Sequence, residues 1–124
     1  MKDLLANYNQ SSELQKLGFN EPCFGRYDGK GDNKGKLWYE MPNSGQDTIP
    51  VGDVLAPTFS QAFRFFREKY DITQTVARDG SLAKEGPWAY TIVSDYIFFN
   101  DGYLSYEEAE SACLDKLIEL AKTK

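Results

Sequence analysis

Histidine is absent from this 124-residue chain, and cysteine occurs only twice. The most common general base at neutral pH is therefore missing, and a serine or cysteine nucleophile would need another activator. Two cysteines without histidine cannot form a zinc site of the usual kind. We predict no catalytic residues, no bound metal and no cofactor. Because no secretory signal is visible, we expect Cys23 and Cys113 to be free thiols in a reducing compartment.

Long apolar segments are also missing. No segment approaches the roughly 18–20 apolar residues that a membrane-spanning helix needs, and the first residues lack the apolar stretch of a signal peptide. We therefore expect a cytoplasmic protein without a membrane partner.

Basic residues are outnumbered by acidic ones, 14 to 19, which gives a net charge of -5. Between residues 95 and 119, seven acids stand against one lysine, a net charge of -6. This charge opposes non-specific attraction to nucleic acids. One interpretation is a solvated helix face that maintains solubility; the other is a docking surface for a basic protein partner. The candidate docking residues are Glu107, Glu108, Glu110, Asp115 and Glu119.

Aromatic residues are abundant, at 15% of the chain, so a short sequence can still fill a core. Three segments have helical features: residues 11–17, residues 58–70 and the stretch that begins at Ser105. Each starts with the spacing of a capping box, in which a Ser or Thr precedes Glu or Gln by three residues. The three pairs are Ser12 with Gln15, Thr58 with Gln61, and Ser105 with Glu108.

Alternating aromatic and β-branched residues predict strands between these helices. Residues 42–57, rich in Pro and Gly, predict an irregular crossing, and Asn100–Gly102 predicts a turn. Ser94 and Asp95 predict a tight turn between two strands. The predicted strands are residues 23–28 and 36–41, joined as a hairpin, then 72–78, 88–93 and 96–99.

These elements predict an α+β fold in one domain, residues 1–124: an antiparallel sheet, two main amphipathic helices on one face, and a short N-terminal helix. Segments 58–70 and 105–117 align without gaps, and each follows a predicted hairpin. A duplicated ββα unit, with halves 19–70 and 88–121, is therefore an alternative. The expected core residues are Phe63, Phe66, Ile92, Phe98, Tyr106, Ala109, Cys113 and Leu117.

Two motif matches fail on their context. Ser81 and Lys84 have the S-x-x-K spacing of serine acyl enzymes, but glycine and proline on both sides leave no room for the helix that this chemistry needs. Residues 28–33 (DGKGDN) resemble the start of a calcium loop. Lysine stands at its third position and asparagine at its sixth, where an oxygen ligand and glycine are required.

The first predicted hairpin offers an alternative function. Aromatic side chains flanked by cations on a sheet can stack unpaired bases, at about 1–3 kcal/mol per base. The same aromatic side chains could instead form the core face under a helix. The residues of this alternative nucleic-acid face are Phe24, Arg26, Lys30, Lys34, Lys36 and Trp38.

The strings LGFNEPCFGRYD (17–28), APTFSQAFRFFREKY (56–70) and YEEAESACLDKLIEL (106–120) occur in this order along the chain. In combination they resemble a group of short uncharacterised proteins from phages, prophages and other mobile elements of gut anaerobic bacteria. Asp71 stands where that group has glycine. Residues 88–118 are more weakly similar to antitoxins of the HicB type. The first resemblance implies a bacterial host cell and no particular activity.

The function expected from these observations is a non-enzymatic accessory protein that binds a host or phage protein. The alternative is a single-stranded nucleic-acid-binding or HicB-antitoxin-like regulatory module. A homodimer is not predicted.

Overall fold

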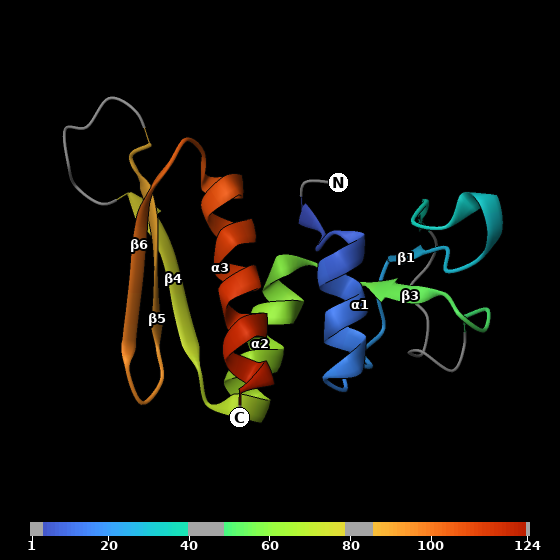
Figure 1. Cartoon of the computed structure of the whole chain (residues 1–124), viewed down its shortest axis with the longest axis horizontal. Helices are drawn as coiled ribbons and strands as arrows, with labels where there is room; N and C mark the ends of the chain where they lie inside the picture. Colours follow the sequence, from blue (N-terminus) through green and yellow to red (C-terminus); the bar gives the residue numbers. More distant parts are fainter. Residues whose placement is uncertain (1–3, 40–48, 79–85, 124) are drawn as a thin grey trace. The chain divides into compact units, whose positions relative to one another are not determined.

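The computed structural model describes residues 4–39, 49–78 and 86–123. Helices and antiparallel sheets both contribute to the fold, so the predicted α+β class is confirmed (Figure 1). The strands form two sheets of three strands each, where we expected one sheet. The chain divides into two compact units, residues 1–62 and residues 63–124. Among the described residues, no helix combines the length and the apolar composition needed to span a bilayer.

Helix α1 (Tyr8–Lys16) opens the first unit. The side chain of Asn7 accepts a hydrogen bond from the backbone of Gln10 at 2.8 Å, and the Gln10 side chain accepts one from the Asn7 backbone at 2.9 Å. This capping box places the helix start before the predicted pair at Ser12, so the predicted start was too late. The predicted stop is confirmed, because Gly18 has a φ of 102° immediately after the last turn.

The first sheet has the order β2-β1-β3. Strands β1 (Gly25–Tyr27) and β2 (Leu37–Tyr39) form the predicted hairpin, with the short 3-10 helix η2 (Gly31–Asn33) in its loop. Strand β3 (Val54–Ala56) pairs antiparallel with β1. It lies in the segment 42–57, so the prediction of an irregular crossing was wrong for these three residues. A strand this short, between prolines and glycines, leaves no alternation to recognise.

The core of the first unit lies between α1 and this sheet. The Tyr27 hydroxyl donates to the carbonyl oxygen of Ala6 at 2.6 Å, and its ring meets the edge of the Tyr8 ring with 5.8 Å between centroids. The buried members of this cluster are Leu5, Tyr27, Val54 and Ala56, with Tyr8 and Leu37 packed against them.

Helix α2 (Phe59–Tyr70) begins at the predicted capping box. The Thr58 hydroxyl accepts from the Gln61 backbone at 3.1 Å, and the Gln61 side chain accepts from the Thr58 backbone at 2.9 Å. The boundary between the two units falls inside this helix. Its buried apolar residues include the predicted core residues Phe63 and Phe66; the others are Phe59, Ala62 and Phe65.

The second sheet has the order β4-β5-β6 and is fully antiparallel. Its strands are β4 (Thr73–Arg78), β5 (Trp88–Val93) and β6 (Ile97–Tyr103). All three predicted strands are confirmed, and β6 extends beyond its predicted end at residue 99. In the second sheet, the strand outside the β5–β6 hairpin is β4, which precedes the hairpin in the chain. In the first sheet, the strand outside the β1–β2 hairpin is β3, which follows the hairpin. The order of the strands thus differs between the two sheets, and the duplicated ββα unit stays a prediction.

The predicted turn at Asn100–Gly102 is wrong, because β6 continues through it. A register shift between the pairs made by Trp88 and Tyr90 absorbs the irregular backbone. Gly102 has a φ of 87°, and a Cβ placed on Gly86 would lie 2.3 Å from the Gly102 carbonyl oxygen. The two glycines thus let the backbones approach closely, and the turn-like composition serves a bulge.

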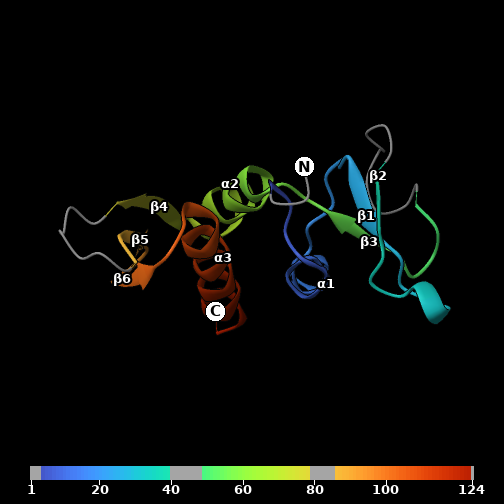
Figure 2. The same ribbon diagram turned by 90° about the horizontal axis from the view of Figure 1, so that it is seen from above.

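Helix α3 (Tyr106–Lys122) covers one face of the second sheet (Figure 2). The predicted cap is present, since the Ser105 hydroxyl accepts from the Glu108 backbone at 3.1 Å. The Glu108 carboxylate accepts from the Leu104 backbone at 3.1 Å and not from the cap residue itself. The buried residues of α3 are Ala109, Cys113, Leu114, Leu117, Ile118 and Ala121.

Most of the predicted core is confirmed by burial. Tyr106 was wrongly placed there: it is 40% exposed, because it lies in the first turn of α3 at the rim of the sheet, edge-on to Trp88. Phe98 is only half-buried. The predicted core residues that are buried are Phe63, Phe66, Ile92, Ala109, Cys113 and Leu117.

Candidate functional site

The face of the second sheet opposite α3 carries no charged side chain among the residues aligned on it. Strand register places Thr73, Val93 and Ile97 in one row and Thr75, Thr91 and Phe99 in the next. Because side chains alternate across a strand, these rows point away from Ile92 and Phe98, which face α3. We call this surface the open face. It consists of Thr73, Thr75, Ala77, Thr91, Val93, Ile97 and Phe99; Ala89, which shares this side of β5, is buried.

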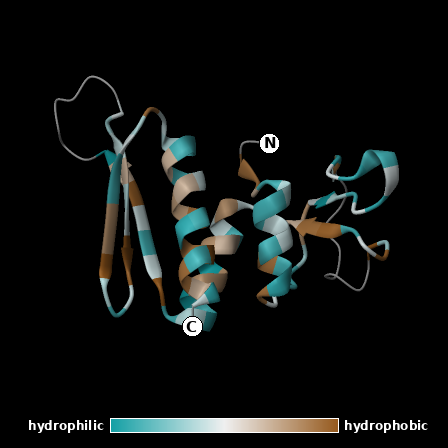
Figure 3. Ribbon diagram, viewed as in Figure 1, coloured by the Kyte–Doolittle hydropathy of each residue, from teal (hydrophilic) through white to brown (hydrophobic). Residues whose placement is uncertain are grey.

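Large apolar side chains of the open face are exposed. Ile97 is 74% exposed, Phe99 58% and Val93 44%. Figure 3 shows the apolar residues of β5 and β6 in brown, in the lower part of the hairpin. An antiparallel sheet with one solvated face usually carries polar side chains there. An uncharged, partly apolar face with a large aromatic ring is instead typical of a surface that another molecule covers.

The five predicted docking residues all lie on α3, but their surroundings differ. Glu107, Glu108, Asp115 and Glu119 are exposed, whereas Glu110 is half-buried. The Glu119 carboxylate accepts from Lys116 at 3.4 Å, and Glu108 caps its own helix. Part of this acidic surface is therefore already occupied by contacts within α3.

Glu110 has an unusual environment for a carboxylate on a helix surface. Burial raises its pKa above the ordinary value of 4.5, and the nearby Glu107 adds to this rise. A hydrogen bond with Tyr106 acts in the opposite direction and lowers the pKa. Because burial is the largest cause, the ionised form is disfavoured in the folded protein.

The sequence left open whether the aromatic side chains of the alternative nucleic-acid face are covered by a helix or exposed to solvent. Phe24 is 49% exposed and Trp38 is 38% exposed, so these rings do not lie under a helix. Lys30, Lys34 and Lys36 are exposed along the loop between β1 and β2 and at its end. The structure thus brings the predicted cations and aromatic rings to one hairpin.

The ring of Trp38 already has two cationic neighbours. The guanidinium carbon of Arg26 lies 5.8 Å from the ring centroid, and the Lys36 ammonium lies 4.4 Å from it. Arg26 also forms an ion pair with Asp53, whose other carboxylate oxygen accepts from the Gly29 backbone at 3.0 Å. These contacts engage the ring surface that a base would use for stacking.

The candidate nucleophiles are not arranged for covalent chemistry. Cys23 and Cys113 are both buried, and burial raises the pKa of each thiol to about 12. Since the thiolate is the reactive form, both are unreactive at neutral pH. Ser81 and Lys84 lie outside the described residues. In the described part of the chain, no group of three His, Cys, Asp or Glu residues could hold a metal ion.

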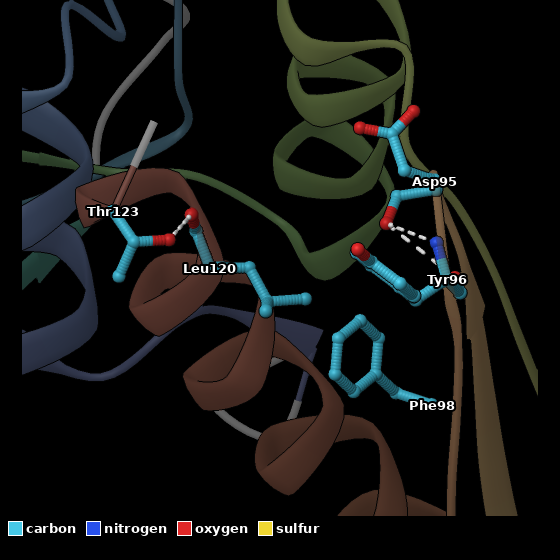
Figure 4. A pocket seen from close by; sticks show the side chains of 6 residues that line it. Asp95, Tyr96, Phe98, Leu120 and Thr123 are labelled. Carbon is cyan, nitrogen blue, oxygen red and sulfur yellow. Dashed lines mark hydrogen bonds between the residues drawn. The ribbon is translucent and has the colours of Figure 1, made fainter.

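A pocket that sequence analysis missed lies between the β5–β6 turn and the last turns of α3. Its volume is about 240 Å³. Figure 4 shows the rings of Tyr96 and Phe98 and the side chain of Leu120 around it, with Asp95 at its edge and the Asp95 carboxylate directed outward. Ser94 and Thr123 complete the lining. Asp95 and Leu120 are 25 positions apart, so no local sequence signal connects the two sides of this pocket.

No family model, curated protein or solved structure matches this chain. The resemblance to mobile-element proteins therefore stays a prediction. Residues 88–118, for which the sequence suggests a weak similarity to HicB-type antitoxins, fall on β5, β6 and α3, that is, two strands followed by a helix. An antitoxin-like function also stays a prediction.

Proposed function

We propose that this protein is a non-enzymatic accessory protein of a phage or other mobile element, and that it acts by binding another protein in the bacterial cell. The open face is the binding surface. The observation that carries the proposal is the exposure of Val93, Ile97 and Phe99 on a sheet face whose paired residues are all uncharged.

The general composition of protein interfaces supports the open face as a binding surface. Their cores are depleted of charged residues and enriched in aromatic ones, and a few well-packed large side chains supply most of the affinity. Phe99 and Ile97 are suited to that contribution, while the threonines of β4 and β5 keep the free surface soluble. Small size and buried, protonated thiols are further support for a binding rather than a catalytic function.

The acidic helix contributes in a different way. Exposed carboxylates such as Glu107 and Asp115 attract a basic partner from a distance and raise the association rate. This contribution falls with ionic strength, because exposed charges are screened within about 10 Å at 0.1 M salt. The acidic residues therefore accelerate the encounter, and the open face holds the complex together.

The test is a paired substitution on the open face, Ile97→Thr with Phe99→Thr. Threonine is favoured in strands, so the sheet is preserved while the apolar area is lost. Tagged protein is captured from host cells, co-purifying proteins are identified by mass spectrometry, and the affinity of the purified partner is then measured by calorimetry. We expect a loss of at least about tenfold in affinity, in line with hot-spot residues.

Val51→Thr is the matched control, since Val51 is an exposed apolar residue of the first unit. It should bind the partner as the unmodified protein does. Equal affinity of the double variant and the unmodified protein would overturn the proposal. Light scattering also tests for a dimer of the unmodified protein that is lost in the double variant. If such a dimer is found, the molecule that covers the open face is a second copy of this chain.

Single-stranded nucleic-acid binding is the second candidate, favoured by the exposure of Phe24 and Trp38. Its test is a titration with a fluorescent single-stranded oligonucleotide. Under our proposal, binding is weak, and Lys30→Glu, Lys34→Glu and Lys36→Glu together change it little. Strong binding that is lost in this triple variant and weakens as salt increases would favour the second candidate.

A further inference from the structure

The pocket beside the β5–β6 turn adjoins the open face. Ile97 and Val93 form the row of the open face nearest the turn, and Tyr96, the next residue, lines the pocket. A partner that covers the open face can therefore reach the pocket around the end of the hairpin.

The size of the pocket limits its occupant. Small-molecule sites usually measure about 300–1,000 Å³, and this pocket is smaller, at about 240 Å³. One side chain of a protein partner is a more suitable occupant than a cofactor. Anchors of this kind, inserted into a pocket of the other protein, supply much of the affinity of many interfaces.

The lining is apolar inside and acidic at the rim. Tyr96 and Phe98 present aromatic rings, and Leu120 presents an aliphatic wall opposite them (Figure 4). Asp95 is exposed, and among the described residues it has no ion-pair partner. Lys116 lies beside the pocket, 5.2 Å from the centroid of the Phe98 ring, and its charge is offset by the ion pair with Glu119.

These properties select a particular side chain. An apolar stem fits against the rings and Leu120, and a cation fits at Asp95. Arginine combines both, because its planar guanidinium stacks on aromatic rings and also forms two parallel hydrogen bonds with a carboxylate. Lysine offers a point charge without the planar surface, and an uncharged side chain leaves Asp95 unpaired.

We propose that this pocket binds an arginine side chain of the protein partner, with the guanidinium at Asp95 and over Tyr96 and the stem against Phe98 and Leu120. This inference rests on the proposed function. It adds to that function the chemistry of one anchor residue, and it agrees with the acidic charge of residues 95–119.

The test uses a probe that does not depend on the partner. N-acetyl-arginine methylamide is titrated into ¹⁵N-labelled protein, and N-acetyl-citrulline methylamide, which has nearly the same shape without the charge, serves as the matched probe. We expect amide shifts at residues 94–98 and 120–123 with the arginine probe, and binding at least about fivefold weaker with the citrulline probe.

Two variants localise the effect. Asp95→Asn should weaken the arginine probe to the level of the citrulline probe. Asp101→Asn removes another exposed carboxylate of the same hairpin that does not line the pocket, and it should bind as the unmodified protein does. The amide spectra of both variants also show whether the fold is preserved.

The inference is overturned if the two probes bind equally, if Asp95→Asn has no effect, or if the shifts spread evenly over the acidic residues of α3. The proposed function has a separate readout in the open-face variant. Loss of the partner in that variant, with no arginine selectivity in the titration, removes this inference and leaves the proposed function. Arginine selectivity in the titration, with unchanged partner affinity in the open-face variant, removes the open face as the binding surface and leaves the arginine pocket.

Discussion

The backbone N–H of Ile72 donates to the carbonyl oxygen of Phe66 at 3.3 Å, across the end of α2. This contact requires the intervening Asp71 to adopt a left-handed conformation, and its φ is 56°. Asp71 is the only residue other than glycine with a positive φ among residues 4–39, 49–78 and 86–123. Glycine would bear no steric cost at this position.

Asp71→Gly should therefore stabilise the protein by roughly 0.5–1 kcal/mol. The substitution removes the left-handed strain of an L-residue and also a negative charge at a helix C-terminus, where the helix dipole disfavours it. For a chain of this size, the melting temperature should rise by about 2–5 °C. Differential scanning calorimetry measures the change. A lower melting temperature would show that the Asp71 side chain makes a favourable contact that outweighs the strain.

The ion pair between Arg26 and Asp53 should stabilise the first unit. Asp53 is nearly buried and also accepts from the Gly29 backbone. Asp53→Ala removes a carboxylate that binds a mostly buried guanidinium, so we expect a loss of about 3 kcal/mol in the free energy of unfolding, measured by urea denaturation. Asp53→Asn keeps an acceptor for Gly29 and should lose less. The control Asp32→Ala, at an exposed position of η2, should change stability by no more than about 0.5 kcal/mol.

Helix boundaries were predictable where a capping residue and its partner lie three positions apart. Thr58 and Ser105 were found in this way. Asn7 with Gln10 follows the same rule, and it was missed because only the serine pair at Ser12 was considered. Strand β3 could not be found from pattern, because its three residues are buried by partners distant in sequence and carry no period of their own.

The candidate site was only partly predictable for a related reason. Charge composition identified the acidic helix, since Glu107 and its neighbours are close in sequence. The open face depends on strand register, which places Phe99 beside Thr91 and leaves it uncovered. The pocket depends on tertiary packing of Leu120 near the β5–β6 turn. Neither relation is encoded by a local motif, so neither could be inferred before the chain was folded.

Glu110 should reduce stability at neutral pH. Its pKa is higher in the folded than in the unfolded chain, mainly because of burial, so its favourable contribution is complete only below about pH 4.5 and is lost as pH rises through the folded pKa. Glu110→Gln should therefore raise stability at pH 7, by up to about 0.5 kcal/mol. The gain should shrink as pH falls toward 4. Glu107→Gln removes the neighbouring charge, which is a smaller cause of the raised Glu110 pKa than burial, and should show a smaller gain. Thermal melts of both variants from pH 4 to pH 8 make the comparison.

The two buried thiols should lower the stability of the folded protein at alkaline pH. Burial raises the pKa of Cys113 from 9.0 to about 12, and that of Cys23 likewise. The unfolded chain loses these protons first as pH rises, so the stabilising contribution is complete below about pH 9 and is lost between pH 9 and pH 12. Cys113→Ala removes one of the two groups. Its free energy of unfolding should start lower at pH 7, by about 1 kcal/mol from the lost packing, and should fall less steeply above pH 9.

A thiol reagent such as DTNB provides an independent measurement at pH 8: the folded protein should react slowly, and both cysteines should react at once in guanidinium. Rapid reaction of the folded protein would show that at least one thiol is accessible, and the steeper alkaline decline of the unmodified protein would then lose its basis.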